Sequence, residues 1–160
     1  MRRAIDVIPH GGWDAGAASA TVTLAFDERH RRRMTLKDDA GEPFLLDLDR
    51  PRLLCDGDGL VLAAGETIVV RAAAEPVADV RAPDPAAIAR LAWHIGNRHA
   101  PLQVLSEGTL RIRDDAVLIT MLEGLGAQIS RHLAPFTPEG GAYAATHRHE
   151  DAAAGAAEPH

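Results

Sequence analysis

The sequence predicts an α+β protein made of two small folded parts and a flexible tail, and three observations lead to that prediction. Up to about Arg71, apolar residues alternate with the period of β-strands. From Asp84 onward, apolar residues twice recur with the spacing of an α-helix. After Pro138 the chain is rich in Gly, Ala and charged residues and has little to bury. We therefore expect domains at 1–73 and 74–138, and a tail at 139–160.

Residues 1–73 are predicted to form a small all-β domain. Val22, Leu24 and Phe26 alternate with smaller or polar residues, as in a half-buried strand. Further runs of strand-forming residues follow at 34–36, 44–48, 60–62 and 67–70. The connections between them carry the Asp and Gly residues of tight turns, at 38–41, 56–59 and 64–65.

The second domain is predicted to contain a first helix that begins at Asp84. Its carboxylate can cap the helix, and Pro85 suits the first helical position. Apolar residues at i, i+3, i+4 and i+7 give one stripe, which consists of Ile88, Leu91, Ala92 and Ile95. Gly96 and Asn97 are residue types that end helices in a left-handed conformation, so we expect the helix to end there.

A hairpin and a second helix are predicted next. Residues 102–105 and 109–113 pair across a turn at Glu107 and Gly108. Asp114 or Asp115 caps the helix, and Gly124 and Gly126 end it. The apolar stripe of this helix consists of Val117, Leu118, Met121, Leu122 and Leu125.

Residues 77–82 and 127–133 are predicted to be the first and last strands of the second domain. The order is then strand, helix, strand, strand, helix, strand. This is the order of the ferredoxin-like βαββαβ fold.

Composition restricts the class of protein. A net charge of −6 argues against binding to a nucleic-acid backbone, and the basic run at 29–33 is expected to be a solvated strand edge or turn. The single cysteine, Cys55, excludes an intrachain disulfide and is expected to be a small buried residue. The sequence contains neither a membrane-spanning run nor the apolar segment of a signal peptide, so we expect a cytoplasmic protein.

Two histidines, His94 and His99, lie five positions apart near the predicted end of the first helix. On a continuous helix this spacing turns the rings about 140 degrees apart, which excludes a simple helical metal site. His94 adjoins the apolar stripe, and we expect it to pack. His99 can project beyond the helix, where a metal site shared with a second copy of the chain would solve the shortage of ligands. The residues alone leave open whether His99 binds a metal.

The tail carries a second group of histidines, His147, His149 and His160. A His-x-His pair on a flexible segment can wrap one ion, and imidazole nitrogen suits nickel, zinc or copper. We expect metal binding here, and the alternative is a solvated polar tail.

Nothing in the sequence predicts an enzyme. The serines are Ser19, Ser106 and Ser130, and none lies in a nucleophile elbow. No glycine-rich phosphate loop is present, and no spacing of histidines and carboxylates suggests an arranged acid–base pair.

Several segments together resemble the UreE family of urease accessory metallochaperones. The most specific is AWHIGNRHAPLQV at 92–104, which is similar to the central motif of the family's metal domain. The family has similar sequences on both sides of this motif, which here are EPVADVRA before it and PFTPEGGAY after it. In the first half, RRRMTLKDDAGEPFLLDLDRP and LLCDGDGLVL resemble the family's N-terminal domain.

The resemblance implies a nickel carrier that delivers Ni²⁺ to apo-urease. It implies a homodimer formed through the second domain, with His99 of each chain binding the ion at the dimer interface. His94 would support the site or bind more weakly, and the histidines of the tail would add ligands. The implied partners are the urease accessory GTPase (UreG) and the apo-urease activation complex, with no nucleic acid or membrane.

Two departures from the family bear on capacity. The segment RIRDDAV lacks the additional histidines that some members carry before the second helix, and the tail is short. Both favour a few delivery sites over metal storage. Other functions that remain are a metal-independent adaptor whose β domain binds a partner segment, and a general zinc or copper buffer at the same residues.

Overall fold

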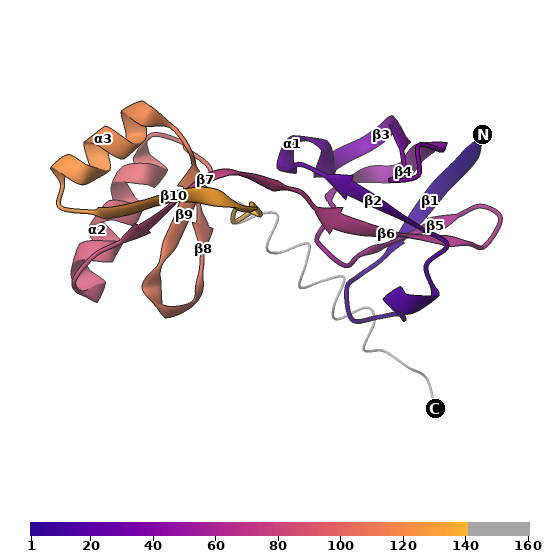
Figure 1. The fold of residues 1–160 in the computed structure, drawn as a ribbon, viewed down its shortest axis with the longest axis horizontal. Coiled ribbons are helices and arrows are strands. Elements are labelled where there is room, and N and C mark those ends of the chain that lie inside the picture. The colour runs from indigo at the N-terminus through magenta and orange to yellow at the C-terminus, as the bar shows by residue number, and fades with distance from the viewer. Residues whose placement is uncertain (141–160) are drawn as a thin grey trace. The chain divides into compact units, whose positions relative to one another are not determined.

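The computed structural model describes residues 1–140 and divides into two compact units (Figure 1). The first unit comprises Met1–Ala78 and Arg131–Thr137. The second comprises Asp79–Ser130 and, of the described residues, 138–140. The chain is therefore α+β, as the sequence predicts, and it returns to the first unit after completing most of the second.

One mixed sheet forms the first unit, with its strands in the order β2-β6-β5-β1-β4-β3. The pairs β1–β4 and β2–β6 are parallel, and the remaining neighbours are antiparallel. The sheet curls, because Asp39, just after β3, donates its N–H to Thr21 O of β2 at 2.7 Å. The strands are β1 (Arg2–Ile8), β2 (Ala20–Leu24), β3 (His30–Lys37), β4 (Pro43–Leu53), β5 (Gly59–Leu62) and β6 (Thr67–Ala72).

Two parts of this unit differ from the prediction. Strand β1 was not predicted, and β2 ends at Leu24, so Phe26 begins a short helix, α1 (Phe26–Arg29), instead of continuing the strand. The helix forms because Glu28 accepts the N–H of Ala25 at 3.0 Å and Glu75 accepts that of Phe26 at 2.9 Å. A short 3₁₀ turn, η1 (Ala15–Ala17), precedes β2.

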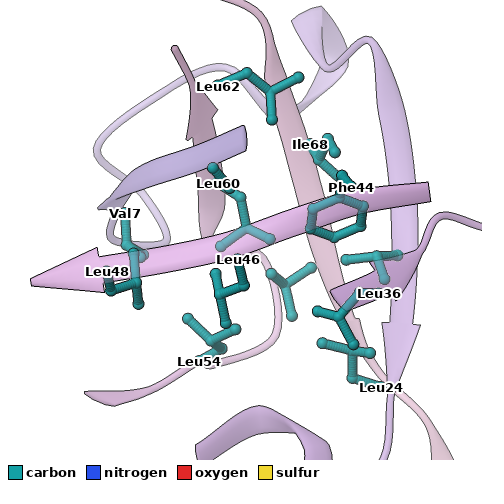
Figure 2. Packing of buried hydrophobic residues seen from close by; sticks show 13 residues of the cluster. Val7, Leu24, Leu36, Phe44, Leu46, Leu48, Leu54, Leu60, Leu62 and Ile68 are labelled. Carbon is teal, nitrogen blue, oxygen red and sulfur yellow. The ribbon is translucent and has the colours of Figure 1, made fainter. Parts of the chain in front are cut away.

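The interior of the first unit is almost entirely aliphatic. Phe44, Leu46 and Leu48 of β4 point inward as predicted, and each is at most 3% exposed. In Figure 2, Leu46 and Leu60 lie in the middle of a cluster that runs from Val7 to Leu24. The predicted turns also form, with Gly41, Gly57 and Gly65 at φ of 90°, 87° and 101°. Cys55 is half-buried instead of fully buried, because it lies at the surface between β4 and the turn at Gly57.

Arg29 is the largest correction in this unit. The basic run was expected to be solvated, and residues 30–33 are indeed exposed on β3, but Arg29 is fully buried. Its guanidinium donates to Leu54 O at 3.2 Å, to Thr137 Oγ1 at 3.1 Å and to Phe136 O. Desolvation by burial lowers the pKa of Arg29. The side chain thus ties the end of the described chain to α1 and to the residue after β4.

The second unit has the predicted ferredoxin-like order, βαββαβ, and its strands lie in the sheet order β10-β7-β9-β8 (Figure 1). Two strands, β7 and β10, contribute residues to both units. The elements are β7 (Ala74–Arg81), α2 (Pro85–Asn97), β8 (Gln103–Val104), the 3₁₀ turn η2 (Ser106–Gly108), β9 (Leu110–Arg113), α3 (Ala116–Gly124) and β10 (Gln128–Pro135). No helix in residues 1–140 has the length and apolar character needed to cross a membrane.

Both helices begin as predicted, but α3 turns a different face inward. Asp84 accepts the N–H of Ala87 at 2.7 Å, and Asp115 caps α3. Leu118, Ile119 and Leu122 of α3 are buried, whereas Val117 and Leu125 are 71% and 48% exposed. The predicted stripe was therefore wrong in part. Residues 117–119 and 121–122 are all apolar, so their spacing alone does not select the inward face.

Candidate metal centre

His99 lies at the end of α2, in a turn that the sequence placed slightly too early. The helix continues through Gly96 and Asn97, and His99 itself takes the left-handed conformation, at φ 56°. The prediction for Gly96 and Asn97 was therefore wrong. The N–H of His99 donates to Gly96 O at 3.0 Å, and that of Ala100 donates to Ile95 O at 3.4 Å. These two bonds are those of a Schellman motif, in which glycine usually occupies the left-handed position.

The position of this turn has two local causes. Ile95 is fully buried, which holds the last turn of α2 against the interior of the unit. Pro101 disfavours a helical conformation at Ala100, so the chain must leave the helix by residue 99. A left-handed conformation at a residue other than glycine is strained by about 1–2 kcal/mol.

The side chain of His99 is exposed to solvent, on a backbone that hydrogen bonds hold at both ends of the turn. An imidazole in this position is accessible to an ion from solution. It also loses little backbone freedom on binding, because the turn is already formed. Strain that persists at an exposed residue is a reason to look for a function there.

His94 has a different environment. It lies in the last turn of α2, is half-buried, and contacts the ring of Trp93 edge to face, with ring centroids 5.0 Å apart. This agrees with the prediction that His94 packs. Trp93 itself is 63% exposed, so α2 presents a large aromatic side chain at the surface.

The described residues do not complete a metal site within one chain. Across residues 1–140, no three His, Cys, Asp or Glu side chains gather in a way that could hold an ion. The predicted ligands His147, His149 and His160 lie outside the described residues. Within 1–140, His99 is thus a single accessible imidazole, and other ligands must come from another segment or another copy of the chain.

Sequence reasoning missed the features that set this turn apart. Gly96 and Asn97 often end helices, so the sequence predicted the left-handed position at them and not at His99. Pro101 was the available sign that the helix ends later, because proline disfavours a helical conformation at the residue before it. The exposure of Trp93 was not predicted either, although its position outside the apolar stripe was an available signal.

Two family models cover nearly the whole chain. Residues 3–73 match the N-terminal domain of the UreE urease accessory protein, and residues 75–160 match its C-terminal domain. The chain belongs to the UreE family.

Individual relatives agree with this assignment. The urease accessory protein UreE of Bradyrhizobium sp. (strain ORS 278) is 50% identical over 144 residues, which is 90% of this chain and 68% of the relative. UreE of Chelativorans sp. (strain BNC1) is 52% identical over 130 residues, or 81% of each chain. UreE of Rhodobacter capsulatus is 46% identical over 89% of this chain and 87% of the relative.

Membership in the UreE family assigns the general role of this chain. It is an accessory protein of urease maturation and not an enzyme, as the sequence predicted.

Proposed function

We propose that this UreE chain binds Ni²⁺ through His99 and delivers it to apo-urease during assembly of the urease active site. The observation that carries the proposal is the exposed imidazole of His99 on the strained, hydrogen-bonded turn after α2. Nitrogen ligands of this kind suit Ni²⁺, and they suit Zn²⁺ and Cu²⁺ as well. The turn positions the ring, and the metal is the cargo.

A homodimer through the second unit supports this site, because a two-fold axis would bring two copies of His99 to one ion. The second unit has large apolar side chains that one copy of the chain leaves exposed. They are Trp93 at 63%, Val104 at 55%, Val117 at 71% and Leu125 at 48%. Apolar surface of this kind is covered favourably by another protein surface, and a second copy of the same unit is the partner we propose.

The tail would complete the coordination sphere of the ion. His147, His149 and His160 lie beyond residue 140, and imidazoles from a separate segment can join and leave an ion one at a time. Stepwise loss of ligands favours transfer of the ion over permanent retention. The recipients in this proposal are the accessory GTPase UreG and the apo-urease activation complex, and His94 has a supporting or weaker role.

A calorimetric Ni²⁺ titration at neutral pH tests this proposal. The intact protein should show a tight step of one ion per two chains, and His99→Gly should lose that step while keeping its fold. His132→Ala is the matched control, because His132 is exposed on β10 and is not in the proposed site.

The other outcomes separate the remaining functions. Equal binding by the parent and by His99→Gly would move the metal site to the tail. No binding by either would favour a metal-independent adaptor. Tight binding of many zinc or copper ions per chain, without any effect of this protein on urease activation, would favour a metal buffer.

A further inference from the structure

Five arginines gather on the paired strands β3 and β4 of the first unit, and we call this set the basic ribbon. Four of them are exposed and one is half-buried. In the register of the two strands, Arg31 lies directly opposite Arg52. The basic ribbon consists of Arg31, Arg32, Arg33, Arg50 and Arg52.

Nearby carboxylates balance only part of this charge. Asp47 accepts a hydrogen bond from Arg3 Nε at 2.8 Å and lies 3.9 Å from Arg33 Nε. The hydrogen bond from Arg3, and then the positive charges of Arg33, Arg3 and Arg32, hold the pKa of Asp47 below its usual value. Within residues 1–140, neither Arg31 nor Arg52 has a carboxylate partner.

The stability of the sheet does not explain this arrangement. Like charges directly opposite each other on antiparallel strands destabilise the pair, and Arg31 and Arg52 are such a pair. The whole chain has a net charge of −6, so the ribbon has the opposite sign to the protein that carries it. An unfavourable local arrangement without a compensating contact, such as this like-charge pair, is more common at functional surfaces than elsewhere.

The position of the ribbon suggests how a partner would be recognised. β3 is the last strand in the order of the sheet, so one of its sides pairs with β4 and its other side is an edge, which β2 approaches at Asp39, just after the strand ends. The register shifts between Arg31 and Arg33, where Arg32 Nε donates to Leu48 O at 3.2 Å. An edge strand offers backbone N–H and C=O groups to an extended segment, and the arginines beside it favour acidic side chains.

We propose that the basic ribbon docks an extended acidic segment of a partner protein along the outer edge of β3. The backbone of β3 would hold the segment in register, and Arg31 and Arg52 would pair with its carboxylates. This proposal does not depend on metal binding and stands whether or not His99 binds nickel.

A protein segment suits the ribbon better than a nucleic acid does. The charged part of β3 is only three residues long, or about 10 Å, which spans few phosphates. The acidic remainder of the chain would also repel a long polyanion.

Fluorescence anisotropy with a labelled peptide that alternates Glu and Val tests the proposal on the full chain. The peptide should bind at low salt, and its affinity should fall as salt increases. The double variant Arg31→Glu/Arg52→Glu should bind at least about tenfold more weakly. The control Arg90→Glu/Arg98→Glu changes the net charge equally at exposed positions of α2 and its end, and should bind like the parent.

Hydrogen–deuterium exchange of residues 30–37 would locate the bound peptide. The amides of β3 should exchange more slowly when the peptide is present. The double variant Arg31→Glu/Arg52→Glu replaces one like-charge pair by another in the same register, so it should melt close to the parent. A melting temperature close to that of the parent would show that loss of binding does not reflect loss of fold.

Five results would overturn the proposal. The Glu–Val peptide could fail to bind, or a Gln–Val peptide could bind equally well. The α2 control could lose as much affinity as the ribbon variant. A single-stranded oligonucleotide could bind more tightly than the peptide, which would indicate a nucleic-acid surface. Finally, β3 could already be protected in the free protein and lose that protection in the ribbon variant, which would make a segment of this same chain the occupant.

Discussion

The two units of the molecule differ in how completely one chain buries its apolar residues. In the first unit, every strand of the sheet contributes buried side chains to one cluster centred on Leu46 and Leu60. The second unit is smaller, yet four of the large exposed apolar side chains in residues 1–140 belong to it, which are Trp93, Val104, Val117 and Leu125, whereas the first unit has Met1, Ile5 and Leu133. Relative to its size, the second unit therefore exposes more apolar surface, and that surface is suited to a partner.

The units also differ in how they use polar and charged residues. Arg29, Asp38 and Asp58 are buried in the first unit, where each makes hydrogen bonds that hold loops and chain ends in place. The second unit instead leaves His99 exposed on a strained turn. Of the buried polar or charged residues in residues 1–140, all except Thr109 thus lie in the first unit, and the best candidate for binding an ion lies in the second.

Each unit carries one of the two tryptophans, which makes the comparison measurable. Trp13 lies in the first unit, where its Nε1–H donates to Gly57 O at 3.2 Å, and Trp93 lies in the second. Replacing either with Phe leaves a single fluorescent reporter, so the unfolding of each unit can be followed by itself.

The largest effect is expected for Arg29→Ala. This change removes all the hydrogen bonds of a buried guanidinium and should destabilise the first unit by about 3 kcal/mol. Urea unfolding followed through Trp13, in a Trp93→Phe background, would measure the free energy. Arg31→Ala, at an exposed position, should change it by no more than about 0.5 kcal/mol. Equal effects of the two variants would show that burial of Arg29 does not stabilise the unit.

A smaller effect is expected on self-association. Val117→Asp places a charge on the exposed face of α3 and should weaken the proposed homodimer by about 2 kcal/mol. Sedimentation velocity over a range of concentrations would measure the change. Ile5→Asp makes the same exchange at an exposed apolar residue of the first unit, and association should persist in that variant. If Ile5→Asp dissociated the protein and Val117→Asp did not, the partner surface would belong to the first unit.

His99→Gly should stabilise the second unit by about 1 kcal/mol, because glycine adopts the left-handed conformation without strain. Unfolding followed through Trp93, in a Trp13→Phe background, would detect the gain. His99→Ala keeps a Cβ at the same φ and should show no such gain. A loss of stability in His99→Gly would mean that the imidazole stabilises the fold, which would count against a binding role.

The smallest effect is expected for the stability of the first unit at acidic pH. Hydrogen bonds from Arg2 and Arg3 lower the pKa values of Asp38 and Asp47 in the first unit. Since the folded pKa lies below the unfolded value, each carboxylate stabilises the fold above about pH 4, and this contribution disappears as the pH falls through the lowered pKa. Asp47→Asn should therefore be less stable than the parent near neutral pH, and the difference should narrow in acid. A difference in stability that widened in acid would contradict a lowered pKa of Asp47.

Local patterns in the sequence predicted much of the fold. The order βαββαβ, the caps at Asp84 and Asp115, and the inward face of β4 all depend on residues close together in the chain. Arg29 was missed because its acceptors are distant, with Leu54 25 positions away and Phe136 107. The buried face of α3 was predicted only in part for another reason. Nearly all residues of this helix are apolar, so packing against the rest of the unit determines which of them are buried.

The candidate site was predicted by residue type and placed only roughly by local preference. His99 was singled out as the histidine able to project from the domain, and it is exposed. Its left-handed backbone follows from the buried Ile95 before it and from Pro101 after it, which together outweigh the preferences of Gly96 and Asn97. The ligands of the tail, and the ion itself, stay predictions.

Native mass spectrometry is the most direct test of the claim that two copies of His99 share one ion. Ni²⁺ would be added at one ion for every two chains, to the parent protein and to His99→Gly. We expect a dimer carrying a single Ni²⁺ for the parent and an ion-free species for the variant. Nickel-loaded monomers, or equal loading of the variant, would contradict it.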